Sequence, residues 1–94
     1  MERDITNEEF KMITDLVREK KSEVEKLPTK EDKLEIYAHG MQGGYGDCEN
    51  EKPAFYEIKE KFKWEAWNDL KGMDKQNARR RFYELTKEFH GVTL

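Results

Sequence analysis

The segment 58–70 carries a lysine inside a wide apolar face. With Ile58 at 0° on a helical wheel, Lys63 falls at about 140°, between Leu70 at about 120° and Trp67 at about 180°. The apolar arc is wider than the single stripe that a core-facing helix needs. A cation at the edge of an apolar groove suits an amphiphile with an anionic head group. The alternative is a lysine whose stem packs on tryptophan while its ammonium group reaches water.

Tyr37 and Met41 form a second candidate pair, because residues four apart share one face of a helix. The ring of Tyr37 suits stacking on a ligand, but a tyrosine with a hydrogen-bonded hydroxyl is also an ordinary core residue. Met41 is interpreted either as a core residue or as an apolar wall of a groove.

The remaining reactive residue types do not combine into a catalytic or metal site. His39, His90 and Cys48 lack the spacing of metal ligands, and Cys48 lacks the partner pattern of a catalytic nucleophile. His39 is interpreted as a residue of the helix surface. The glycine-rich stretch 40–46 matches neither phosphate-binding glycine motif. We therefore predict no catalytic residues, no metal and no cofactor, and hence a protein that is not an enzyme.

The charges are nearly balanced, with 18 Lys and Arg against 21 Asp and Glu and a net charge of −3. Domains that bind nucleic acid usually carry a basic surface. Arg79, Arg80 and Arg81 are consecutive, so on a helix they point about 100° apart and form no single basic patch. We interpret them as a solvated helix face and predict no nucleic-acid partner.

The 94 residues are enough for one modest domain, which we expect to span 1–94. Charged residues make up 41% of the chain, yet aromatic residues reach 12%, and a disordered chain would lack those aromatics. The single cysteine cannot form an internal disulfide, and no apolar run approaches the length of a membrane span. We expect a monomeric, cytoplasmic protein without a membrane span.

Four helices are needed to position these residues, and no strand pattern is present. Thr6 and Glu9 form a capping-box pattern before the first helix, and Asp74 is a suitable N-cap for the last one. Glycines from position 40 onward weaken the second helix, so we expect it to fray or end early. The fold class is all-α, a four-helix arrangement. The expected helices cover about 7–26, 30–43, 57–71 and 74–89.

Three segments, in this order, resemble the acyl-CoA-binding protein (diazepam-binding inhibitor) family. They are Ile36-Tyr37-Ala38-His39, then Gly46-Asp47-Cys48, and then Lys63-Trp64-Glu65-Ala66-Trp67 followed by Leu70-Lys71-Gly72. The last motif, with a capped helix after it, is highly specific, and the match covers essentially the whole chain. The resemblance implies an up-down-down-up four-helix bundle that binds long-chain fatty acyl-CoA esters without catalysis.

The resemblance also implies a ligand site. In the family, the residues that match Tyr37 and Lys63 contact the nucleotide head of the ligand, including its ribose 3′-phosphate. The implied ligand-binding set is Tyr37, Ala38, His39, Gly40, Met41, Lys63 and Phe82.

This chain departs from the family pattern within that site. Gly40 stands where a tyrosine packs on the adenine, Met41 where a lysine meets phosphate, and Phe82 where the family has a tyrosine. The leading interpretation is an acyl-CoA carrier with an altered head-group site. One alternative is a protein–protein interaction module that kept the scaffold and weakened or lost acyl-CoA binding. Another is a domain of a longer enzyme or of a membrane-tethered protein.

Overall fold

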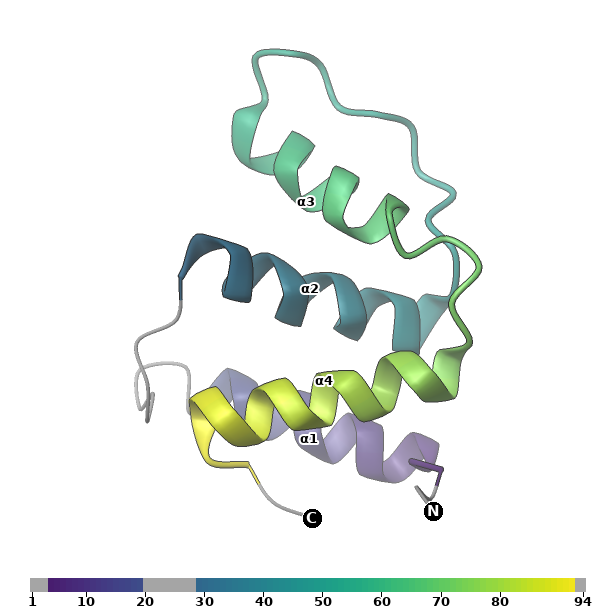
Figure 1. Cartoon of the computed structure of the whole chain (residues 1–94), viewed down its shortest axis with the longest axis vertical. Coiled ribbons are helices and arrows are strands. Elements are labelled where there is room, and N and C mark those ends of the chain that lie inside the picture. The colour runs from purple at the N-terminus through teal and green to yellow at the C-terminus, as the bar shows by residue number, and fades with distance from the viewer. Residues whose placement is uncertain (1–3, 20–28, 93–94) are drawn as a thin grey trace.

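The computed structural model describes residues 4–19 and 29–92, and these residues form four helices and no strand. The helices are α1 (Asn7–Glu19), α2 (Lys30–Tyr45), α3 (Ile58–Asn68) and α4 (Lys75–His90). In Figure 1, α1 and α4 run in one direction while α2 and α3 run in the other. The predicted all-α, up-down-down-up bundle is therefore confirmed.

Polar caps fix the first residues of these helices. Thr6 Oγ1 accepts from the Glu9 amide and Glu9 Oε1 accepts from the Thr6 amide, both at 3.1 Å, so the predicted capping box is present. Before α4, Asp74 Oδ2 accepts from the amides of Gln76 at 3.0 Å and Asn77 at 3.2 Å. These side chains satisfy amide groups that have no partner inside a first helical turn.

The expected early end of the second helix was wrong. α2 continues through Gly40, Gly43 and Gly44 to Tyr45 and ends at Gly46, whose φ is 84°. A Cβ on Gly43 would lie 2.9 Å from Cγ of Arg79 on α4, so the missing side chain lets the two helices approach closely. Tertiary packing therefore offsets the weak helix propensity of glycine. The expected continuation of the first helix from 20 to 26 lies outside the described residues.

The third helix is shorter than expected, because it ends at Asn68 and a turn covers 69–72. Oδ1 of Asp47 accepts from the Gly72 amide at 2.8 Å and from Nε2 of Gln42 at 2.9 Å. The same Gln42 nitrogen donates to the Met73 carbonyl at 2.9 Å. These bonds attach the turn after α3 to the end of α2. The hydrogen bond from the Gly72 amide, and then that from Gln42, hold the pKa of Asp47 below its usual value.

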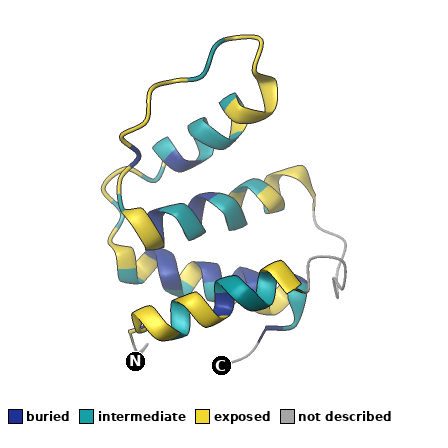
Figure 2. Cartoon of the chain, turned by 180° about the vertical axis from the view of Figure 1, so that it is seen from behind, coloured by how far each residue is buried: buried dark blue, intermediate teal, exposed yellow. Residues whose placement is uncertain are grey.

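α2 is the middle element of the bundle, with α3 on one side and α4 and α1 on the other (Figure 1). Buried residues lie where these helices face one another, whereas α3 and the loop before it are mostly half-buried or exposed (Figure 2). One apolar cluster joins α1, α4 and the C-terminal segment, and a second joins α2, the following loop and α3. The buried members are Ile5, Ile13, Phe82 and Val92 in the first cluster and Ala38, Cys48 and Trp67 in the second.

Within residues 4–19 and 29–92, no helix is both long and apolar enough to cross a bilayer.

Candidate ligand-binding site

A hollow of about 480 Å³ opens between α1, α2 and α4. Four predicted site residues line it: Tyr37, Gly40, Met41 and Phe82. The other lining residues are Phe10, Thr14, Arg18, Ile36, Gly44 and Tyr45. Most of this wall is apolar, so the hollow suits the burial of a ring or a hydrocarbon chain.

Gly40 and Phe82 lie next to each other in the wall of this hollow. A Cβ on Gly40 would lie 3.1 Å from Cε1 of Phe82, which is closer than an ordinary carbon contact. The Phe82 ring is itself buried and packs against Phe10, with ring centroids 5.4 Å apart. The glycine therefore leaves open the space over the Phe82 ring.

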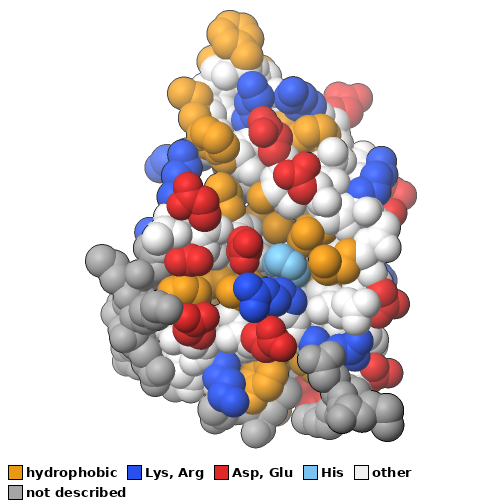
Figure 3. Space-filling model, viewed as in Figure 1, with side chains coloured by type: hydrophobic (Ala, Val, Ile, Leu, Met, Phe, Trp, Pro, Cys, Tyr) orange, Lys and Arg blue, Asp and Glu red, His pale blue; other side chains and the backbone are white. Residues whose placement is uncertain are grey.

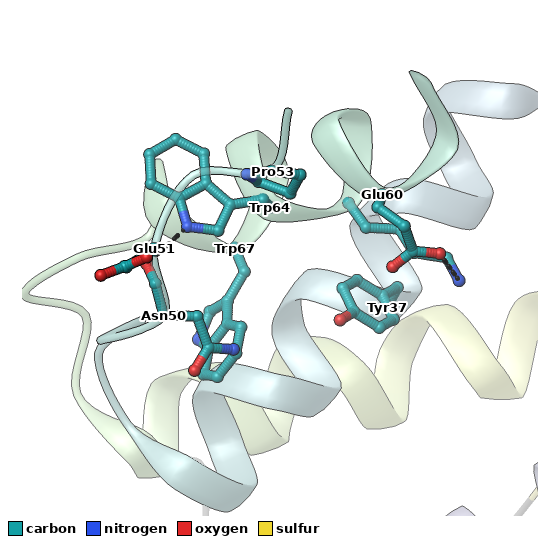
Figure 4. Close-up of a pocket in the computed structure, with 8 residues that line it drawn as sticks. Tyr37, Asn50, Glu51, Pro53, Glu60, Trp64 and Trp67 are labelled. Carbon is teal, nitrogen blue, oxygen red and sulfur yellow. Dashed lines mark hydrogen bonds and ion pairs between the residues drawn. The ribbon is translucent and has the colours of Figure 1, made fainter. Parts of the chain in front are cut away.

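Lys63 does not line the hollow. It lies in a smaller pocket of about 130 Å³ between α3, the preceding loop and α2, together with Trp64, Trp67 and Tyr37 (Figure 4). Its Nζ is 5.5 Å from the centroid of the Tyr37 ring and 3.8 Å from Oε1 of Glu60. The side chain is 45% exposed, so its charge faces an open pocket. We refer to this space as the lysine pocket.

Tyr37 lines both the hollow and the lysine pocket. Burial, and then the nearby carboxylate of Glu60, raise the pKa of the Tyr37 phenol above its ordinary value. The phenol therefore stays protonated at neutral pH and remains able to donate a hydrogen bond. Tyr37 therefore forms a wall that the hollow and the lysine pocket share.

Ala38 and His39 line neither space. Ala38 is buried with Cys48 and Trp67 in the cluster between α2 and α3. His39 is also buried, and its Nδ1 lies 2.7 Å from the carbonyl oxygen of Glu35 in the same helix. The interpretation of His39 as a surface residue was wrong. α2 lies between α3 and α4, so more than one face of this helix is covered by neighbouring helices.

Arg79 is likewise not part of a solvated face. It is buried, and its Nε donates to the Gly43 carbonyl at 2.9 Å while Nη1 donates to the Ile5 carbonyl at 3.0 Å. Its guanidinium carbon lies 4.9 Å from the centroid of the Phe10 ring, which lines the hollow. Arg79 therefore connects α4, α2 and the segment before α1. Arg80, which forms an ion pair with Asp4 at 3.0 Å, is half-buried.

No residue of α1 was among the predicted site residues, although α1 contributes one wall of the hollow. Phe10, Thr14 and Arg18 follow one another at intervals of four, which places them on one face of a helix. This spacing could have indicated a common face, but the sequence alone did not show that α2 and α4 lie opposite that face. Arg18 is exposed and is the one cationic side chain among the described lining residues of the hollow. The described residues contain no group of three His, Cys, Asp or Glu side chains placed to hold a metal ion.

Comparison with known sequences decides the family. Residues 7–86 match the family described as Acyl CoA binding protein. The chain belongs to this family. It is 38% identical over 80 residues to the Acyl-CoA-binding protein of Saccharomyces cerevisiae, covering 82% of this chain and 92% of the yeast protein. The Acyl-CoA-binding protein 2 of Saccharomyces pastorianus is 39% identical over 74 residues, which cover 76% of this chain and 85% of that protein. The resemblance read from the motifs is confirmed.

Solved structures carry the same acyl-CoA-binding-protein fold. The crystal structure of ACBP from Moniliophthora perniciosa superposes with a TM-score of 0.75 at 22% identity, over 92% of this chain and 81% of that one. The solution structure of the acyl CoA binding protein from Babesia bovis superposes with a TM-score of 0.65 at 31% identity, over 83% and 89% of the two chains. The bundle described above is therefore the fold of this family.

Proposed function

We propose that this protein binds long-chain fatty acyl-CoA esters and carries them in the cytoplasm, as a monomer and without catalysis. Family membership supports the ligand class. The observation that carries the proposal is the position of Tyr37, which lines both an apolar hollow and a pocket that contains a lysine. An amphiphile with an anionic head needs both environments side by side.

The proposed roles follow from this arrangement. Lys63 meets a phosphate of the head group, because its half-exposed ammonium faces the lysine pocket. Tyr37 and Phe82 pack on the head group from α2 and α4. Arg18 supplies a second cation at the α1 wall. Apolar side chains of the hollow and of α3 shelter the acyl chain.

We propose further that the head-group site is weakened at positions 40 and 41. A lost aromatic stack costs roughly 1–3 kcal/mol by analogy with base stacking. A lost hydrogen bond to a charged group costs about 1.5–3 kcal/mol. Together these losses lower affinity by about 10²–10⁴ relative to a member with tyrosine and lysine at these positions. Met41 also packs against the cluster between α2 and α3, so its thioether contributes to the core as well.

Calorimetric titration tests the proposal, with palmitoyl-CoA, free CoA and free palmitate as separate ligands. We expect palmitoyl-CoA to bind more tightly than either part, because only the ester combines the head-group contacts with burial of the acyl chain. If none of the three ligands binds to the folded protein, the alternative of a protein–protein interaction module on the same scaffold is favoured. Equal affinity for palmitate and palmitoyl-CoA would mean that the CoA head group contributes nothing to binding, which contradicts the proposed roles of Lys63 and Tyr37.

A further inference from the structure

Four large apolar side chains are exposed together at one end of the molecule. The exposed fractions are 84% for Phe55, 72% for Tyr56, 62% for Ile58 and 40% for Phe62. Phe55 and Tyr56 pack edge to face with ring centroids 5.5 Å apart. We call these four residues the apolar tip. Phe55 and Tyr56 lie in the turn before α3, whereas Ile58 and Phe62 belong to α3 itself. The turn lies at the end of the molecule opposite α1 (Figure 1).

Lysines surround the apolar tip. On α3, Ile58 and Phe62 form a short stripe, and Lys59 and Lys61 lie about 80° to either side of its centre. Nζ of Lys30 on α2 lies 3.7 Å from the centroid of the Phe62 ring. Figure 3 shows hydrophobic side chains at the top of this face with Lys or Arg side chains directly beneath them.

The local charge is opposite in sign to that of the whole chain. The segment 52–63 has four lysines and two glutamates, giving a net charge of +2, whereas the chain has −3. Both glutamates have partners within the protein: Glu57 Oε2 accepts from the Ala54 amide at 2.9 Å, and Glu60 pairs with Lys63 at 3.8 Å. The surface around the apolar tip is therefore complementary to an anionic partner.

We propose that the apolar tip docks on the surface of an anionic lipid bilayer. Phe55 and Tyr56 project from the turn and line none of the hollows described above, so this surface fits a deformable partner better than a preformed protein groove. Exposed aromatic residues favour the boundary between head groups and acyl chains, and flanking lysines favour anionic head groups. This inference rests on the surface alone and is independent of the proposed function.

Flotation with lipid vesicles tests the inference on the full chain without any acyl-CoA present. Vesicles of phosphatidylcholine are compared with vesicles that also contain phosphatidylserine, at low and at high salt. We expect binding to the phosphatidylserine vesicles, and we expect it to weaken as salt rises. The double variant Phe55→Ser/Tyr56→Ser should bind at least about tenfold more weakly, because it removes the inserted rings.

Two further variants separate apolar from electrostatic contributions. Lys59→Glu/Lys61→Glu should weaken binding to anionic vesicles by at least about fivefold per lysine lost. Met12→Ser is the matched control, since Met12 is 50% exposed on α1, away from the apolar tip, and this change should leave binding unaltered. The altered positions are exposed, apart from the half-buried Lys61, so the Tm of each variant should stay close to that of the unaltered protein.

Three results would overturn the inference. One is that the unaltered protein fails to float with phosphatidylserine vesicles at low salt. Another is that Phe55→Ser/Tyr56→Ser floats as well as the unaltered protein. The third is a concentration-dependent dimer in vesicle-free buffer that the same double variant abolishes, because the apolar tip would then be covered by a second copy of the chain.

Discussion

At the scale of single residues, Gly40 and Met41 are the positions at which we propose an altered head-group site. Both line the hollow, and Gly40 faces the Phe82 ring. A side chain at position 40 must displace that ring by a few tenths of an ångström, because its Cβ would lie only 3.1 Å from Cε1 of Phe82.

The double change Gly40→Tyr, Met41→Lys should tighten palmitoyl-CoA binding at least about tenfold, since the two added groups together are worth roughly 2.5 kcal/mol or more. Part of the gain is an ion pair, so it should shrink as salt rises. Calorimetry at two salt concentrations measures both effects. Gly40→Ala serves as the control, because it adds the Cβ without a ring. Unchanged affinity in a folded double variant would mean that the ligand does not lie over this part of α2.

Lys63→Ala should weaken palmitoyl-CoA binding by about 10-fold to 100-fold, the effect of losing a charged hydrogen bond of roughly 1.5–3 kcal/mol. The free energy of unfolding should barely change, since the pair with Glu60 is exposed and such pairs contribute little. Calorimetry and chemical denaturation on the same variant measure the two quantities. Lys61→Ala, on another face of α3, should leave affinity intact. Lost stability with unchanged affinity would instead assign Lys63 to packing on the tryptophans.

At the scale of elements, the apolar spacing of α4 matches its buried face. Ala78, Phe82, Leu85 and Phe89 of α4 are all buried, as their spacing indicates. The spacing could not predict which backbone carbonyl groups of other segments lie next to α4. Arg79 is buried because carbonyl groups distant in sequence accept its hydrogen bonds, and no local pattern encodes those partners.

The same reasoning applies to the candidate site. Resemblance and spacing identified four lining residues of the hollow, and they identified Lys63. They did not predict that Lys63 occupies a separate pocket, that Ala38 packs with Trp67 of α3, or that His39 is buried. In one wall of the hollow, Phe10 of α1 lies beside Gly43 and Gly44 of α2. The helix propensity of these glycines alone predicts an early end of α2.

Gly43→Ala should lower the free energy of unfolding by about 1–3 kcal/mol through overpacking. Its Cβ would lie 2.9 Å from Cγ of Arg79, 3.2 Å from Cε1 of Phe10 and 3.3 Å from the Arg79 backbone nitrogen. Gly44→Ala is a matched control in the same helix, because its Cβ would make an ordinary contact of 3.4 Å with Phe10. That control should be neutral or stabilising by up to about 1 kcal/mol. Denaturant unfolding compares the two, and equal stability would contradict the close approach of α2 and α4.

Asp47→Asn should lower the Tm near neutral pH, because a charged acceptor between α2 and the turn after α3 is replaced by a neutral one. The pKa of Asp47 is lowered in the folded protein. Its carboxylate therefore stabilises the fold above the unfolded pKa of about 3.9, and this contribution is lost as pH falls through the lower folded value. The Tm difference between the two proteins should thus shrink below about pH 4. Asp69→Asn, at an exposed acid of the same turn, is the control. A Tm difference that is independent of pH would mean that the charge of Asp47 plays no part.

At the scale of the whole molecule, α2 connects two halves of the structure. It packs on α3 through the cluster of Ala38 and Trp67, and it packs on α4 where Gly43 meets Arg79. The hollow opens on the side of α1 and α4, and the lysine pocket on the side of α3. A ligand that occupies both spaces must therefore contact both halves at once.

The central claim is that the hollow and the lysine pocket form one acyl-CoA site, joined by Tyr37. Titration of the isotopically labelled protein with palmitoyl-CoA, followed by nuclear magnetic resonance, tests it most directly. The account predicts that the amide signals of Gly40 and Gly44 and the indole N–H signal of Trp64 shift together, with the same dependence on ligand concentration. Shifts confined to one of the two spaces, or separate ligand dependences for the two, would contradict it.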